Sequence, residues 1–371
     1  MPPQKNEWPV ESDTSTVRTY DKKKIRGSSL GQWFILFFLT AAAAFLSGYL
    51  TCSMDSSKHL DVAPLNQGTQ ISFFDELRIQ HIQATEGPPP EIVHDIKGRS
   101  ISLPFASTQS DSAKCLRSWQ AMKTMVPQLI SGNNQRPYST NNEDALVLEH
   151  ILAMHEPANT AEDSLEDAAA SVLWSSSTRT FHFLEIGGFD GITESNTLLF
   201  ERCLNWRGML VEANPVAWEA LKIAGRTHSH LVHASPSCNL TSLPLSSNLL
   251  RGESFTPMVK MEGHSYTSSA ITTGDAPKGL DVPCVPLTAI LASVGMGRID
   301  FFSLDVEGSE ELVLSTLDFQ AIDVPLMLVE SENRQCGAVC PKRDRIRARA
   351  QMMGYVVDTV TVRKSDMIYR K

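Results

Sequence analysis

A short apolar strand that runs straight into a glycine turn is the strongest constraint on how this chain folds. Residues 181–186 (FHFLEI) have the length and composition of a buried strand, and GGFDG follows at 187–191. Glycines allow a tight turn and let a ligand approach the backbone closely. Residues 196–204 then show a helical pattern, and a second apolar strand at 208–212 ends in Glu212. Strand, glycine turn and helix in this order are typical of a nucleotide-binding α/β unit.

The residues of the turn indicate which nucleotide it fits. The dinucleotide fingerprint G-x-G-x-x-G needs a second glycine where this chain has Phe189, and the sequence contains no G-x-x-x-x-G-K-[ST] phosphate loop. The pattern E-x-G-x-x-x-G, formed by Glu185, Gly187 and Gly191, instead suits S-adenosyl-L-methionine, which carries no pyrophosphate. Glu212 lies about 20 residues beyond the turn, where an acid contacts ribose hydroxyls. The alternative is an ordinary strand-to-helix turn in another doubly wound domain.

Strands alternate with helices further along the chain. Residues 298–308 contain a buried strand that ends in Asp305 and Glu307, and another apolar strand at 324–330 ends in Glu330. Helices are expected near residues 141–154, 165–173 and 310–317, and a terminal antiparallel pair at 354–362 and 366–370. The predicted fold class is therefore α/β, with a doubly wound, mostly parallel sheet. Ligands of such sheets bind at the carboxyl ends of the strands, so Asp305 and Glu307 are expected beside the cofactor and the acceptor.

Three blocks of the sequence resemble the FkbM-type methyltransferases. They are FLEIGGFDGITESNTLLFERCLNWRGMLVEANP (183–215), VPLTAIL (285–291) and IDFFSLDVEGSEELVL (299–314). The resemblance covers about residues 137–371. It implies a class I methyltransferase fold that uses S-adenosyl-L-methionine and transfers a methyl group to a hydroxyl oxygen.

The resemblance also assigns candidate residues. Glu185, Gly187 and Gly191 would form the cofactor turn, Glu212 would hold the ribose, and Asp305 with Glu307 would line the acceptor side. The complete set of cofactor-binding candidates adds neighbours of the turn and of the second strand: Glu185, Gly187, Gly188, Asp190, Gly191, Glu212, Asn214, Asp305 and Glu307.

Methyl transfer to an alcohol needs alignment and a base. The reaction is an in-line displacement at a sulfonium, and the alcohol is a poor nucleophile until it loses its proton. Asp305 and His264 are the predicted catalytic residues, although a loop histidine is more often simply solvated, and His233 is more often structural. Asp305, Glu307 and Glu330 could converge on a divalent ion. Helix capping and core hydrogen bonds explain Glu307 and Glu330 equally well, and no metal site is predicted.

The residues ahead of this region predict a membrane anchor. Residues 31–50 are twenty residues without a charge, about the length that a helix needs to cross a bilayer. Trp33 and Tyr49 lie near its ends, and five Lys or Arg residues precede it in 11–29, against one lysine in 51–70. The positive-inside rule then places the N-terminus in the cytosol. A cleaved signal peptide and a buried core helix are the alternatives.

The chain is thus predicted to have four parts. They are a disordered cytosolic tail (1–29), a transmembrane helix (30–51), a lumenal stem (52–136) and a methyltransferase domain (137–371). Such a single-pass type II protein would reside in the Golgi or the ER with its catalytic domain in the lumen. Six of the seven cysteines lie beyond residue 100 and permit full pairing there, with free thiols as the alternative. Asn239 begins a glycosylation sequon.

Two functions from different classes are consistent with these features. The net charge of −9 and the lack of a basic block argue against a nucleic-acid partner. The expected partners are the lipid bilayer and a hydroxyl-bearing acceptor, such as a glycan or a lipid. The first function is an S-adenosylmethionine-dependent O-methyltransferase. The second is a non-catalytic, membrane-tethered binding or trafficking module that keeps the methyltransferase fold.

Overall fold

The protein is described by a computed structural model that covers most of the chain after residue 72. The described residues are 73–77, 79–125, 138–139, 141–155, 164–237, 258–261, 270–271, 280–332, 340–358 and 364–370. Residues Ile71–Lys371 form one compact unit. Among the described residues, no helix is both long and apolar enough to span a membrane. The predicted anchor at 31–50, His264 and Asn239 lie outside the described residues.

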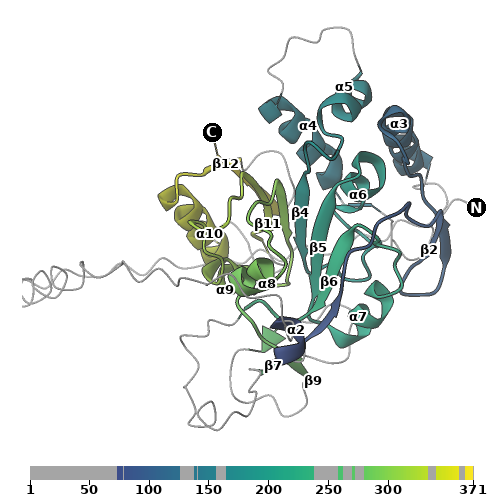
Figure 1. The fold of residues 1–371 in the computed structure, drawn as a ribbon. Coiled ribbons are helices and arrows are strands. Elements are labelled where there is room, and N and C mark those ends of the chain that lie inside the picture. The colour runs from purple at the N-terminus through teal and green to yellow at the C-terminus, as the bar shows by residue number, and fades with distance from the viewer. Residues whose placement is uncertain are drawn as a thin grey trace, which may run out of the picture. The chain divides into compact units, whose positions relative to one another are not determined.

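An eight-stranded mixed sheet forms the centre of this unit (Figure 1), in the order β1-β6-β5-β4-β10-β11-β13-β12. Its strands are β1 (Gln80–Ile82), β4 (His182–Ile186), β5 (Arg207–Glu212), β6 (Ser229–His233), β10 (Phe301–Leu304), β11 (Leu326–Glu330), β12 (Val356–Asp358) and β13 (Ser365–Tyr369). The five strands from β6 to β11 are parallel neighbours, and β13 is antiparallel to both β11 and β12. The predicted α/β sheet with a terminal antiparallel pair is confirmed.

Two smaller sheets accompany the central one. An antiparallel hairpin joins β2 (Ile92–His94) to β3 (Ser100–Ser102). The other sheet has the order β8-β7-β9 and contains β7 (Met258–Met261), β8 (Ala270–Ile271) and β9 (Leu280–Pro283).

Helices cover both faces of the central sheet, so its strands are buried on both sides. The helices are α2 (Phe73–Glu76), α3 (Gln109–Met125), α4 (Glu143–His155), α5 (Leu165–Val172), α6 (Leu198–Leu204), α7 (Pro215–Leu221), α8 (Leu287–Ser293), α9 (Glu310–Ser315) and α10 (Pro341–Met352). Successive strand residues point to opposite faces. Phe183 and Phe301 pack with α3–α6, whereas Leu184 and Phe302 pack with α8–α10. Figure 1 shows these two groups of helices on opposite sides of the strands.

Much of the predicted stem is part of the folded unit. Strand β1 pairs antiparallel with β6 at the edge of the sheet. Helix α3 buries Leu116 and Trp119, and a disulfide between Cys115 and Cys203 joins it to α6 with the two Cα atoms 5.4 Å apart. The compact unit therefore begins at Ile71, not at the predicted boundary of residue 137. The sequence pattern predicts the start of the domain too late, because the apolar residues of α3 are scattered among polar ones.

We expect replacement of Trp119 by alanine to lower the free energy of unfolding by about 3–5 kcal/mol, as for other buried aromatic residues. The Trp119 ring is fully buried, and its Nε1 donates a hydrogen bond to Asp144 at 3.1 Å. Urea denaturation followed by circular dichroism measures the change. Gln120→Ala, at an exposed position of the same helix, is the control. Equal, small effects of the two substitutions would show that α3 is not integral to the fold.

Candidate functional site

The glycine turn lies tightly between the ends of two strands. The backbone N–H groups of Gly187 and Gly188 both donate to the carbonyl of Val211 at the end of β5, at 2.9 and 3.2 Å. On the other side, the N–H of Asp305 donates to the carbonyl of Ile186 at 3.1 Å. Gly187 has φ +83°, and a Cβ atom there would overlap the carbonyl oxygen of Asp305. Only glycine satisfies both the backbone angle and the contact.

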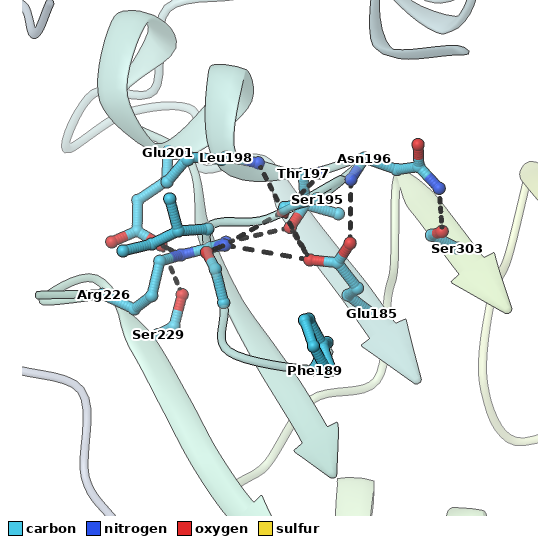
Figure 2. Close-up of polar contacts among 12 residues, drawn as sticks. Glu185, Phe189, Ser195, Asn196, Thr197, Leu198, Glu201, Arg226, Ser229 and Ser303 are labelled. Atoms are coloured by element: carbon cyan, nitrogen blue, oxygen red, sulfur yellow. Dashed lines mark hydrogen bonds and ion pairs between the residues drawn. The ribbon is translucent and has the colours of Figure 1, made fainter. Parts of the chain in front are cut away.

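Glu185, at the inner end of β4, points away from the turn toward the loop that leads into α6 (Figure 2). Its carboxylate accepts hydrogen bonds from Ser195 Oγ at 2.9 Å, the Asn196 N–H at 2.8 Å and Thr197 Oγ1 at 2.6 Å. Glu185 was predicted to contact the cofactor. In the structure, its contacts hold the 195–197 loop in place, so that it positions the site.

Arg226 is a buried residue that supports the turn, and the sequence analysis did not single it out. Its side chain is fully buried, and Nε pairs with Glu201 at 2.7 Å. The remaining nitrogens donate to the carbonyl of Gly191 at 2.8 Å and to Thr197 Oγ1 at 2.9 Å, and approach Glu185 to 3.8 Å. Figure 2 shows this guanidinium between the turn and α6. Arg226 belongs to no sequence motif. Its importance becomes clear only in the structure, where the buried carboxylates of Glu201 and Glu185 lie next to it.

Asp190 and Gly188 also support the turn itself. Asp190 is buried and accepts from the N–H of Thr193 at 2.6 Å and from its Oγ1 at 2.7 Å. Its second oxygen also accepts from the N–H of Ile96 at 2.9 Å, which ties the turn to the β2–β3 hairpin. At Gly188, a Cβ atom would lie 3.2 Å from the Cβ of Leu210. Both residues keep the turn compact.

Glu212 ends β5 beside the turn. Its carboxylate accepts from the N–H of Phe189 at 2.7 Å and of Asn214 at 2.6 Å. Burial raises the pKa of Glu212 to about 7, although these backbone hydrogen bonds oppose the shift. Asn214 caps α7, with its Oδ1 accepting from the N–H of Val216 at 2.9 Å. His233 is structural, because its ring stacks on Trp218 and bonds the Glu212 carbonyl at 2.9 Å.

A pocket of about 190 Å³ opens at the carboxyl ends of β10 and β11. Five carboxylates line it, together with one lysine: Glu143, Glu194, Asp305, Glu307, Glu330 and Lys364. Asp305 is exposed at the mouth of the pocket. Partial desolvation by the pocket wall and the nearby Glu330 raise the pKa of Asp305 well above its usual range. Desolvation and the charge of Glu307 raise the pKa of Glu330 to about 7.

Carboxylate oxygens of Asp305, Glu310 and Glu330 lie within 4.8 Å of one another. Glu310 already has partners, because its buried carboxylate pairs with Lys342 at 2.6 Å and accepts from the N–H of Gly308 at 3.0 Å. Asp305 and Glu330 therefore remain as a pair that faces the pocket. We assign no metal to them.

The predicted site residues thus fall into two groups around the turn. Glu212 is the last residue of β5 and Asn214 follows it, whereas Asp305 and Glu307 lie beyond β10 in the acidic pocket. His264 lies outside the described residues.

We expect Gly187→Ala to lower the free energy of unfolding by more than about 3 kcal/mol, since it combines an unfavourable φ with an overlap of backbone atoms. Gly295→Ala is the matched control. Gly295 has a similar φ of +71°, but no atom lies within 4 Å of a Cβ atom placed there, so about 1 kcal/mol is expected. Urea denaturation of both variants makes the comparison. Equal losses of unfolding free energy in the two variants would mean that the close contact with the Asp305 carbonyl does not require glycine at residue 187.

Comparison with known proteins agrees with this geometry. Residues 185–357 match the family model described as "Methyltransferase FkbM domain", a range that contains the turn, Glu212 and the acidic pair. This match confirms the resemblance over these residues. No curated protein matches the chain.

Three methyltransferases are among the solved structures to which the chain shows a distant likeness. A precorrin-6y C5,15-methyltransferase from Geobacter metallireducens is 11% identical, with 62% of this chain and 87% of that chain covered and a TM-score of 0.29. A putative caffeoyl-CoA O-methyltransferase from Staphylococcus aureus is 11% identical (70% and 92% covered, TM-score 0.27). An O-methyltransferase from Bacillus cereus in complex with SAH is 13% identical (69% and 100% covered, TM-score 0.27). We base no functional inference on likenesses this distant.

Proposed function

We propose that the protein is an S-adenosylmethionine-dependent O-methyltransferase. One observation carries the proposal. The glycine turn lies between the ends of β5 and β10, with Glu212 on one side and the acidic pocket on the other. The turn fits a nucleoside without a pyrophosphate, because Phe189 stands where the dinucleotide fingerprint has its second glycine. The family match over 185–357 supports the same cofactor.

Each side of the turn has a distinct task in this proposal. When bound, the cofactor supplies a methyl group on a positively charged sulfur. Glu212 accepts hydrogen bonds from the ribose hydroxyls and so fixes the nucleoside. Asp305, at the end of β10, receives the proton of the acceptor hydroxyl, since its raised pKa gives it the basicity that a general base needs near neutral pH. The walls of the pocket align the acceptor, on which much of the rate of such a displacement depends.

We expect the full-length protein to bind S-adenosylhomocysteine with micromolar affinity in a calorimetric titration. Glu212→Ala should weaken binding by about ten- to a hundredfold, the value of hydrogen bonds to a charged group. Glu219→Ala is the control, because Glu219 lies on the neighbouring helix α7 with its carboxylate paired to Lys222. A folded wild-type protein that binds neither S-adenosylmethionine nor its product would contradict the proposal and favour the non-catalytic module.

We also propose that the domain works in an oxidising compartment behind a single-pass anchor at residues 31–50. The support for the anchor is its uncharged sequence and the basic residues before it. The support for the compartment is the disulfide between Cys115 and Cys203, together with disulfide-bonded Cys284 and Cys340. Disulfides of this kind persist in the secretory pathway and are rare in the cytosol.

The compartment is tested with the full chain expressed in cells. We expect non-reducing peptide mapping to recover Cys115 and Cys203 as one cross-linked pair, and microsomes to protect residues 71–371 from added protease. Deletion of residues 31–50 should leave both thiols reduced and alkylatable. Protease cleavage in intact microsomes, or reduced thiols in the undeleted protein, would place the domain in the cytosol.

A further inference from the structure

Asp305 and Glu330 form a carboxyl pair at the ends of neighbouring strands. Strands β10 and β11 are parallel, with Leu304 opposite Val329, so that Asp305 and Glu330 occupy the next position along each strand. Their carboxylate oxygens come within 4.8 Å of each other, and both residues line the acidic pocket. The glycine turn touches this end of β10 directly, because Gly187 packs on the backbone of Asp305.

The charges around the pair are predominantly negative. Glu307 and Glu310 face it from the turn after β10 and from the start of α9, and both raise the pKa of each member. Glu143 and Glu194 add two more carboxylates to the pocket wall. Two lysines oppose these negative charges. Lys364, just before β13, lines the pocket, and Lys342 on α10 lies near enough to lower the pKa of Glu330. Lys342 is bound to Glu310, and among the described residues Lys364 is the one cation that lines the pocket.

Two carboxylates this close, in a pocket lined by further acids, resist carrying two negative charges, so the pair retains a proton near neutral pH. Burial and the adjacent acids raise the pKa of both groups. A positive charge that enters the pocket reverses this preference, because an opposite charge within a few ångströms favours the ionised carboxylates. The pocket is therefore suited to sense whether the sulfur of a bound cofactor is charged.

We propose that the Asp305–Glu330 pair releases its shared proton when the cationic cofactor binds, and takes up the hydroxyl proton of the acceptor as the methyl group is transferred. This rests on the proposed function. In the transfer step, a bond forms between the acceptor oxygen and the methyl carbon. The carbon–sulfur bond breaks and its electron pair stays on sulfur. The O–H proton moves to the pair, so the positive charge on sulfur and one negative charge on the pair disappear together.

The test compares S-adenosylmethionine with S-adenosylhomocysteine, which differ in the charge of the sulfur. Both are titrated calorimetrically into the full-length protein at pH 6.5, in buffers of different ionisation enthalpy, to count the protons released. We expect S-adenosylmethionine to release about 0.5–0.8 proton more than the neutral product. The affinity for S-adenosylmethionine, divided by the affinity for S-adenosylhomocysteine, should fall about tenfold from pH 8 to pH 6. Glu212 also titrates near pH 7, but the ribose is common to both ligands and its effect cancels in the ratio.

Glu330→Gln should abolish the difference in proton release while leaving the affinity for S-adenosylhomocysteine within about twofold. Glu311→Gln is the matched control, since Glu311 lies on α9 with its carboxylate bound to Arg345. Equal proton release with the two ligands, or a difference that survives in Glu330→Gln, would overturn the proposal. If Glu330→Gln does not fold, the comparison of the two ligands on the wild-type protein decides. Failure of both ligands to bind would instead refute the proposed function.

Discussion

The buried guanidinium of Arg226 is the interaction on which the rest of the site depends. A charge with no access to water costs several kcal/mol unless it is paired and hydrogen-bonded, so its partners must stay in place. Those partners are Glu201 on α6, Glu185 on β4, the carbonyl of Gly191 and Thr197. One side chain therefore ties together the strand, the turn that follows it and the helix after that. If any of these elements moved out of place, the buried charge of Arg226 would lose one of its partners.

This arrangement separates residues that support the site from residues that face a ligand. Glu185 and Asp190 have the sequence positions of cofactor contacts, but their carboxylates are occupied by the loop and the hairpin. Their hydrogen bonds hold the turn against Val211 and Asp305. Glu212 and the acidic pocket are left on opposite sides of the turn. In the proposed function the chemistry is divided along the sheet, with recognition of the nucleoside at the end of β5 and proton transfer beyond β10.

The sequence predicted the centre of the fold well, because buried parallel strands are continuous apolar runs. The strands predicted at 181–186 and 208–212 are found at His182–Ile186 and Arg207–Glu212. Strand β1 and helix α3 were missed, since neither is apolar enough to be recognised alone. Their burial depends on pairing with β6 and on the disulfide to Cys203, which are contacts between distant parts of the chain.

The same distinction applies to the site. Glu212, Asp305 and Glu330 could be predicted because each follows an apolar strand, and the carboxyl ends of parallel strands lie along one edge of a sheet. The pairing of Asp305 with Glu330 could not, because it depends on β10 and β11 being neighbours in a given register. Arg226 stands in a connection between helix and strand with no motif around it. Its role follows only from the buried acids that surround it.

The pocket also stays acidic because nearby basic residues form ion pairs with other acids. Helix α10 has the sequence PKRDRIRARAQM, and its cations would cancel the pocket's charge if they reached into it. Four of them are bound to acids: Lys342 to Glu310, Arg343 to Glu332, Arg345 to Glu311 and Arg347 to Asp366. These ion pairs leave the pocket around Asp305 and Glu330 predominantly acidic. In the proposed function, such a site attracts a sulfonium and loses that attraction once the methyl group has left and the sulfur is neutral.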